Sequence, residues 1–389
     1  MNKGYVIGNG ENLMVNRSVV IGNSLENTCE KFMDDIMDQF DLPAIAVGVY
    51  CRGEKFTGTK SSSYLDQGSI NPDTIFHCAS VSKLFTSSAI MKLVEEGRLN
   101  LYDRLVDLLP ELNPKMDEAY FREIRLWNML THTSGLGDVP DYCWDKPRLD
   151  NKALSDYVLK SPDVLDNPML WPPQDTPEFY CPVTDEDGKP TNRFRYSNVA
   201  FEILGYIVER YSGMSYEDFI AKSFFEPLGM TDSTMKTFER CDYNNPVARH
   251  GCNMADPFEK DSNSSIQPVE FYPYNREHGP SSTLTSNLGD LLKWGWGHMN
   301  HKPRVLQEET YDTIWRHYAT VPNNGEHMGI GWFMREQKEY KLFGHEGSDD
   351  GFRSSFWICP GLDMVTVVLS NLSQAPVKKI NKRLFEALV

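Results

Sequence analysis

Ser80 and Lys83 stand three residues apart, ahead of a stretch in which apolar residues recur at helical spacing up to residue 94. This spacing places both side chains on one face of a helical turn. A serine at a helix N-terminus gains from the helix dipole and from free N–H groups that can hold a developing oxyanion. A lysine whose pKa is lowered by burial can accept the serine's proton. The pair indicates acyl transfer, although a helix start capped by a serine has the same spacing.

Tyr196 and Asn198 form a second group with chemical potential. They precede an amphipathic stretch, residues 198–211, that predicts a helix. A tyrosine before a helix can direct its phenol at a neighbouring site, and the Asn198 amide can orient a substrate carbonyl or hold a lysine. The structural alternative is an aromatic plug beside a helix cap.

A third group runs from His345 through Glu346 and Gly347 to Ser348, and we expect it to lie at the end of a strand. The glycines beside His345 and Ser348 let a ligand or another backbone approach closely. The histidine can relay a proton, and the Ser348 N–H can act as a second oxyanion donor beside that of Ser80. The structural alternative is a tight turn around a histidine whose hydrogen bonds are satisfied.

Other polar groups are interpreted as structural. His132, in the stretch 131–136, is expected to lie in a turn whose Thr and Ser hydroxyls satisfy backbone groups. The acidic stretch 185–188 lacks the remaining ligands of a calcium loop. The eight cysteines are scattered without a C-x-x-C pair, and Walker A, Rossmann and G-x-S-x-G motifs are absent from the sequence. We therefore predict neither a metal nor a cofactor.

Composition limits the class of protein. The chain has 389 residues, of which 40% are hydrophobic, and a formal net charge of −16. An acidic chain argues against nucleic acid and anionic membranes as partners. The charge mildly favours cationic ligands, and solubility is the simpler explanation for it. Residues 1–23 contain no apolar signal region, and no apolar run reaches membrane-spanning length. We expect a cytoplasmic protein, whose oligomeric state the sequence leaves open.

The order of elements predicts an α/β (α+β) fold with a mixed, largely antiparallel sheet flanked by helices. Sheet strands are expected near both chain ends, and an all-helical domain is inserted between them. The expected division is a leader over 1–23, an α/β domain over 24–100 and 275–389, and a helical domain with loop insertions over 101–274. The polar segment 253–274 is expected to be a lid or an insertion. The expected elements are helices at 25–40, 84–94, 124–130, 151–159, 198–211, 216–225, 288–298 and 380–388, and strands at 43–50, 55–60, 329–335, 340–343, 353–358 and 364–369.

Taken in order, Ser80-Val81-Ser82-Lys83, Tyr196-Ser197-Asn198 and His345-Glu346-Gly347 resemble the three motifs of the serine β-lactamase-like and penicillin-binding superfamily. The matching branch contains class C β-lactamases, D,D-carboxypeptidases, D-aminopeptidases and esterases. The resemblance covers roughly residues 25–389 and implies a β-lactamase/transpeptidase-like fold. Connecting stretches at 93–99, 130–136, 227–230 and 351–354 are also typical of this branch.

The resemblance implies a role for each motif residue. Ser80 would be the nucleophile and Lys83 its general base, while Tyr196 would share the proton transfer and protonate the leaving group. His345 would replace the third-motif lysine. Asn198 would orient the substrate, and the N–H groups of Ser80 and Ser348 would form the oxyanion hole.

Departures from the family pattern bear on the substrate. A histidine at position 345 is similar to D,D-carboxypeptidases and D-aminopeptidases and argues against an efficient β-lactamase. Glu346, counted with Gly347 among the substrate-binding residues, is expected to repel a substrate carboxylate and favour an amine or a neutral ester. The function expected is a serine hydrolase of small amides or esters, with D-amino-acid peptides among the candidates. The alternatives are an acyltransferase using the same site and a low-turnover penicillin-recognising or scaffold protein.

Overall fold

The computed structural model describes residues 24–65, 70–112, 114, 118–166, 172–178, 193–299, 301–322 and 325–389. The expected leader, 1–23, and the acidic stretch 185–188 lie outside these ranges. Within them, no helix combines the length and the apolar character that crossing a bilayer requires.

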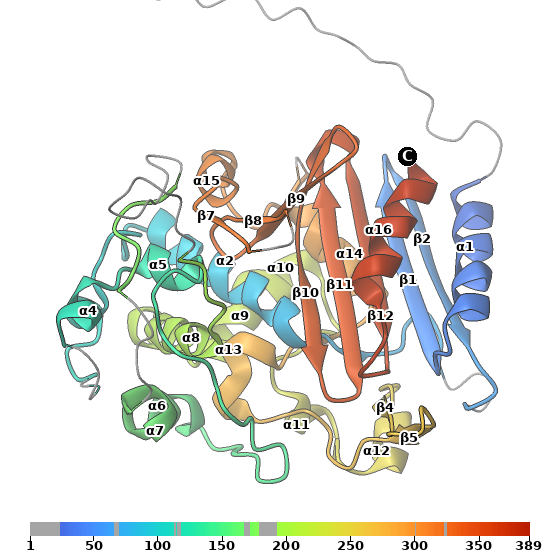
Figure 1. Cartoon of the computed structure of the whole chain (residues 1–389), viewed down its shortest axis with the longest axis horizontal. Helices are drawn as coiled ribbons and strands as arrows, with labels where there is room; N and C mark the ends of the chain where they lie inside the picture. The colour runs from blue at the N-terminus through green and yellow to red at the C-terminus, as the bar shows by residue number, and fades with distance from the viewer. Residues whose placement is uncertain are drawn as a thin grey trace, which may run out of the picture.

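An eight-stranded antiparallel sheet organises the fold, in the order β2-β1-β12-β11-β10-β9-β8-β7 (Figure 1). The N-terminal hairpin joins the last strand, so that Val47 lies opposite Val368. The expected mixed α/β fold, with a largely antiparallel sheet formed from both chain ends, is therefore confirmed. The strands are β1 (Ala44–Cys51), β2 (Glu54–Ser61), β7 (Ala319–Thr320), β8 (His327–Met328), β9 (Phe333–Gln337), β10 (Tyr340–Asp349), β11 (Phe352–Cys359) and β12 (Met364–Ser370).

Helices cover both faces of the sheet, which explains why β1 and β12 are almost continuously apolar. On one face, α1 (Leu25–Gln39) and α16 (Val377–Leu388) pack over a core that we call the outer-face core, which includes Val47, Trp357 and Phe385. The opposite face belongs to a larger cluster, the site-face core, which includes Phe85, Trp294 and Phe356. Figure 1 shows α1 and α16 beside the sheet and most of the remaining helices gathered on its other side.

The regular structure of the chain between the two sheet halves is mostly helical, and long loops connect the helices. The domain boundaries proposed from the sequence stay a prediction. The expectation that the inserted region is all-helical is wrong. The region contains a hairpin, β4 (Phe258–Lys260) and β5 (Ile266–Pro268), within the segment expected to be a lid or an insertion. The hairpin is tied to the sheet, because Phe258 N donates to Asn371 O (3.1 Å) and Ser373 N donates to Phe258 O (2.9 Å).

The remaining elements include the helix that follows Ser80. They are α2 (Ser82–Glu95), α3 (Leu105–Leu108), α4 (Glu118–Glu123), α5 (Leu126–Leu130), α6 (Ala153–Lys160), α7 (Pro162–Leu165), α8 (Asn198–Ser212), α9 (Tyr216–Ile220), α10 (Glu226–Leu228), α11 (Thr237–Arg240), α12 (Pro246–Gly251), α13 (Gly279–Ser282), α14 (Leu288–Gly297), α15 (Glu308–Ile314), the paired strands β3 (Phe76–His77) and β6 (Thr285–Ser286), and short helical turns at 79–81, 221–225, 276–278 and 360–362.

The structure corrects two local expectations. Helix α2 is buried on nearly all sides rather than amphipathic, because α8 and α13 pack against it. Two of its hydroxyls are satisfied within the helix, as Ser87 Oγ and Ser88 Oγ each donate to the carbonyl four residues earlier (2.8 Å), and Thr86 Oγ1 donates to Pro280 O of α13 (2.6 Å). Strand β10 runs through Asp349, so that His345 lies within the strand rather than at its end.

Candidate active site

Ser80 lies in the 3₁₀ turn η1 (Ala79–Val81), which joins β3 to α2. Ala79 has φ 47°, in the left-handed region that side chains rarely adopt. The turn is held by the Ser82 hydroxyl, which donates to Ala79 O (2.7 Å) and accepts from Leu284 N (2.9 Å). The backbone therefore presents Ser80 at the start of α2.

Lys83 contacts Ser80 directly. Its Nζ donates to Ser80 Oγ (3.0 Å) and to Ser281 O (2.8 Å), and the side chain is fully buried. Burial lowers the pKa of Lys83 to about 8, although nearby carboxylates, Glu202 first among them, act in the opposite direction. A substantial fraction of Lys83 is therefore neutral near pH 8 and able to accept a proton.

Tyr196 completes a cluster with Ser80 and Lys83. The Lys83 Nζ lies 5.0 Å from the centroid of the Tyr196 ring. Burial raises the pKa of Tyr196 well above its usual value, and the Ser80 hydroxyl acts in the opposite direction. The Tyr196 hydroxyl is buried and makes no hydrogen bond of normal geometry with the described residues, although the Ser80 hydroxyl lies close enough to affect it. Tyr196 is thus a neutral phenol beside the serine, suited to donate a proton.

His132, interpreted from the sequence as part of a structural turn, supports Tyr196. The His132 ring stacks on the Tyr196 ring, with centroids 4.2 Å apart and planes 28° apart. Its Nδ1 accepts from Ser197 N (3.1 Å), and its backbone is left-handed, with φ 56°. Burial lowers the pKa of His132 well below its usual value, with Lys83 contributing, so the ring is neutral. The sequence shows the turn but contains no signal that it lies under a tyrosine 64 positions later.

His345 projects toward the same cluster from β10. Its ring lies 6.1 Å from that of Tyr196 and 4.9 Å from that of Phe333. The Nδ1–H donates to Glu346 O (2.6 Å), so Nε2 is the acceptor nitrogen, and in the described part of the chain it has no partner. Burial, followed by the charge of Lys83, lowers the pKa of His345 to about 3. A neutral acceptor, not a cation, therefore occupies the third-motif position.

The Glu346 side chain does not face Ser80. The expectation that it contacts the substrate is therefore wrong. Successive residues of a strand point to opposite faces, so Glu346 points away from His345. Its Oε1 accepts from Trp357 Nε1 (2.8 Å), in the outer-face core, and lies 3.9 Å from Arg335 Nη1.

Gly347 brings β10 against the nucleophile turn. A Cβ at this position would overlap Cys78 O and Ser354 Oγ, and Ser354 Oγ itself donates to Cys78 O (2.7 Å). The glycine is therefore needed for close packing beside Ser80. β10 pairs with β9 only as far as Gly344, which leaves the following edge open toward the turn. The oxyanion role of the Ser348 N–H stays a prediction.

Asn198 is held by Asp138 rather than by Lys83. Its backbone N and its Nδ2 both donate to Asp138 Oδ1, at 2.8 and 2.9 Å. Its Oδ1 is buried and has no hydrogen-bond partner among the described residues. The amide oxygen is free to accept from a substrate N–H, and its role in orienting substrate stays a prediction.

The electrostatic surroundings of the site are acidic. Asp138, Asp349 and Glu202 each raise the pKa of both Lys83 and Tyr196. They also raise that of Tyr142, an aromatic residue that the sequence analysis did not single out and whose pKa rises chiefly through burial. Because His345 is neutral and these three carboxylates are nearby, a substrate that brings a further negative charge into the site is disfavoured.

Comparisons with known proteins identify the family. The family model described as Beta-lactamase matches residues 29–389. Penicillin-binding protein 4 of Amycolatopsis lactamdurans is 25% identical over 355 residues, covering 88% of this chain and 84% of that protein.

Two solved structures share the fold. The octameric penicillin-binding protein homologue from Pyrococcus abyssi is 26% identical, with a TM-score of 0.68 over 93% of this chain and 77% of that chain. A class C beta-lactamase from Rhodobacter sphaeroides is 20% identical, with a TM-score of 0.65 over 93% and 98% of the two chains. Since the family model spans almost the whole chain, the protein belongs to the Beta-lactamase family.

Proposed function

We propose that this protein is a serine hydrolase that cleaves small amide or ester substrates through an acyl-enzyme on Ser80. The observation that carries the proposal is the 3.0 Å contact between Ser80 Oγ and the Nζ of a fully buried lysine. Burial lowers the pKa of that lysine to about 8, which suits a general base near neutral pH.

The geometry supports a two-step reaction. Lys83 Nζ takes the Ser80 proton as Oγ bonds to the substrate carbonyl carbon, and the carbonyl electrons move to its oxygen. When the oxyanion collapses, the leaving amine or alcohol departs and takes a proton from the phenol of Tyr196, which Lys83 reprotonates. In the second step, water gives a proton to the pair of Lys83 and Tyr196 as its oxygen bonds to the acyl carbon. The bond from that carbon to Ser80 Oγ then breaks, the acid leaves, and the pair returns the proton to Ser80 Oγ.

The charges of the site favour neutral or cationic acyl donors. His345 is neutral, and the negative charges of three carboxylates raise the pKa values of Lys83 and Tyr196. These carboxylates are those of Asp138, Asp349 and Glu202. A substrate carboxylate would meet repulsion there, whereas an ammonium group would be attracted. Peptides or amides with a free amino group, D-amino-acid compounds among them, are therefore the proposed substrates.

Penicillin recognition with slow turnover is a second candidate. It is supported by the 25% identity to Penicillin-binding protein 4 over most of both chains. A penicillin carries a carboxylate, so the charges of the site predict slow acylation by it.

Intact-mass spectrometry after treatment with a fluorophosphonate, and separately with a penicillin, tests both candidates. We expect one fluorophosphonate adduct on the wild type, none on Ser80→Ala, and an unchanged adduct on the control Ser155→Ala, on α6. A penicillin adduct that persists for hours would favour the second candidate. The absence of any adduct on folded wild type would refute the acyl-enzyme.

A matched pair of chromogenic amides tests the charge preference. D-alanine p-nitroanilide is cationic, and its N-succinyl derivative is anionic with the same leaving group. We expect kcat/KM to be at least about tenfold higher for the cationic substrate at low salt, and the ratio to narrow as salt screens the charges. A preference for the succinyl compound would contradict the proposal.

A further inference from the structure

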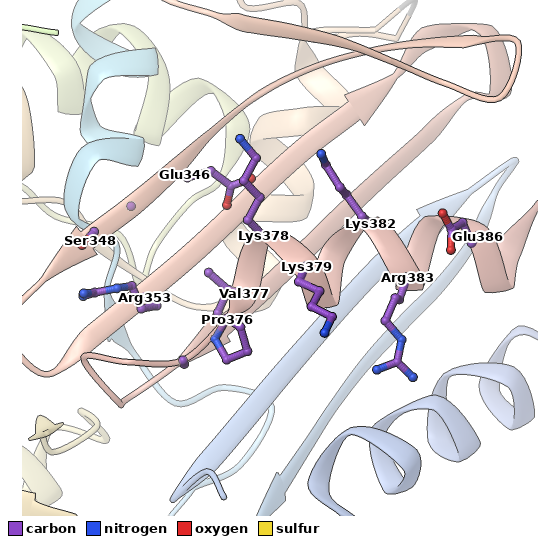
Figure 2. A pocket seen from close by; sticks show the side chains of 12 residues that line it. Glu346, Ser348, Arg353, Pro376, Val377, Lys378, Lys379, Lys382, Arg383 and Glu386 are labelled. Carbon is purple, nitrogen blue, oxygen red and sulfur yellow. The ribbon is translucent and has the colours of Figure 1, made fainter. Parts of the chain in front are cut away.

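A groove of about 690 Å³ lies on the outer face of the sheet, on the opposite side of β10 from His345. It runs between the N-terminal half of α16 and the strands β10 and β11 (Figure 2). It is lined by Glu346, Gly347, Ser348, Arg353, Ala375, Pro376, Val377, Lys378, Lys379, Lys382, Arg383 and Glu386.

The groove is basic in a chain whose net charge is −16. Five of its lining side chains are cationic and two are acidic, one of which, Glu346, has a pKa raised by burial. Lys378 is paired with Glu326 (2.7 Å). The other four cations have no carboxylate within ion-pair distance among the described residues.

Neutral groups hold two of these cations in place. Arg353 Nη1 donates to Asp349 O and Phe352 O (both 2.7 Å), and Arg383 Nη1 donates to Gln39 Oε1 (2.6 Å). Burial and the neighbouring cations Arg335 and Lys378 lower the pKa of Lys382, while Glu326 and Glu346 act in the opposite direction. Gathering like charges costs free energy, which Asp349 and Asp350 offset in part at Arg353 and which a bound anion would recover further.

The start of α16 adds a further attraction for an anion. Pro376 and Val377 line the groove, and the first turn of this twelve-residue helix has no side-chain cap. Val377 N already donates to Ala375 O (2.9 Å), so the next N–H groups of this turn and the positive end of the helix dipole reinforce the charges of Arg353 and Lys378. Figure 2 shows Arg353 next to this helix start, with Lys378 and Lys382 extending over the strands.

We propose that this groove binds a phosphorylated small molecule. Its phosphate would lie between Arg353 and the first turn of α16, and Lys382 would contact further negative charge. The lining contains no aromatic side chain, so recognition would depend on charge rather than on stacking with a base. The groove is separate from Ser80, and binding would not require acylation.

Isothermal titration calorimetry with inorganic pyrophosphate tests the proposal at low ionic strength. We expect saturable one-site binding that weakens with salt, and at least about tenfold weaker binding by Lys382→Gln and by Arg353→Gln. Lys152→Gln, the same charge change at the residue that precedes α6 and outside the groove lining, serves as the control and should bind like the wild type, as should Ser80→Ala. No saturable binding by the wild type, or equal binding by all four variants, would overturn the proposal.

A phospholipid headgroup offers the same chemistry from another source. Co-sedimentation with vesicles of phosphatidylglycerol and phosphatidylcholine distinguishes the two. Vesicle binding that Lys382→Gln abolishes, without measurable pyrophosphate binding, would overturn the proposal in favour of a lipid surface. Pyrophosphate binding without vesicle binding would support the small molecule.

Discussion

At the scale of single residues, the chemistry depends on the protonation of Lys83. The lysine accepts the serine's proton only when it is neutral, and burial lowers its pKa to about 8. Below that pH it is mostly charged, so the acylation rate should rise with pH and level off above about pH 8–9. Pre-steady-state acylation between pH 5.5 and 10 measures this profile, and a flat profile would exclude Lys83 as the base.

Glu202 should set the position of that profile. Its carboxylate raises the pKa of Lys83, while its Oε1 accepts from Ser281 Oγ (2.5 Å). Glu202→Gln keeps the shape and removes the charge, so the midpoint should move to lower pH by roughly half a unit to one unit. The exposed substitution Glu226→Gln is the control. A midpoint that stays in place or moves upward would show that Glu202 carries no charge felt by Lys83.

His132 acts as a positioning residue through Tyr196. His132→Asn removes the stacked ring and should lower kcat by about tenfold or more with little change in KM, because the phenol loses its orientation. His132→Phe keeps the ring and loses the Nδ1 acceptor for Ser197 N, so kcat should largely recover while stability falls by about 1–3 kcal/mol. Equal losses of kcat in both variants would show that His132 does not act by stacking on Tyr196.

At the scale of elements, the contact between β10 and the nucleophile turn depends on Gly347. A methyl group there would push β10 away from Cys78 O, and would misplace the turn that carries Ser80. Gly347→Ala should lower the acylation rate by about a hundredfold while costing only about 1–3 kcal/mol of stability. Gly361→Ala, where a Cβ would meet nothing within 4 Å, is the matched control. A normal acylation rate in Gly347→Ala would contradict this account.

The sequence predicted most elements but misjudged where β10 ends, with consequences for the site. Gly344 and Gly347 weaken the strand pattern, and the pairing with β11 that extends the strand to Asp349 is not visible in local sequence. Once the strand is continuous, alternation sends His345 and Glu346 to opposite faces. The role of His132 was missed for a similar reason, because it arises from contact between segments distant in the chain.

At the scale of the whole molecule, the order of elements was sufficient to predict a sheet formed from both chain ends. Strands rich in β-branched residues occur near both ends, and helical patterns fill most of the chain between them. The sequence did not show that α2 would be enclosed on nearly all sides, since its polar residues are satisfied by backbone carbonyls of its own helix and of α13. Burial of that helix is also what lowers the pKa of Lys83.

The two cores separate stability from chemistry. Phe385 of α16 is fully buried in the outer-face core, while Ser80 and its partners lie across the sheet. Phe385→Ala should therefore lower the free energy of unfolding by about 3–5 kcal/mol, measured by urea denaturation. The acylation rate per folded molecule, measured with a fluorophosphonate well below the unfolding transition, should stay within about twofold of wild type. A fall in that rate comparable to the loss in Gly347→Ala would show that the outer-face core also sets the geometry of the site.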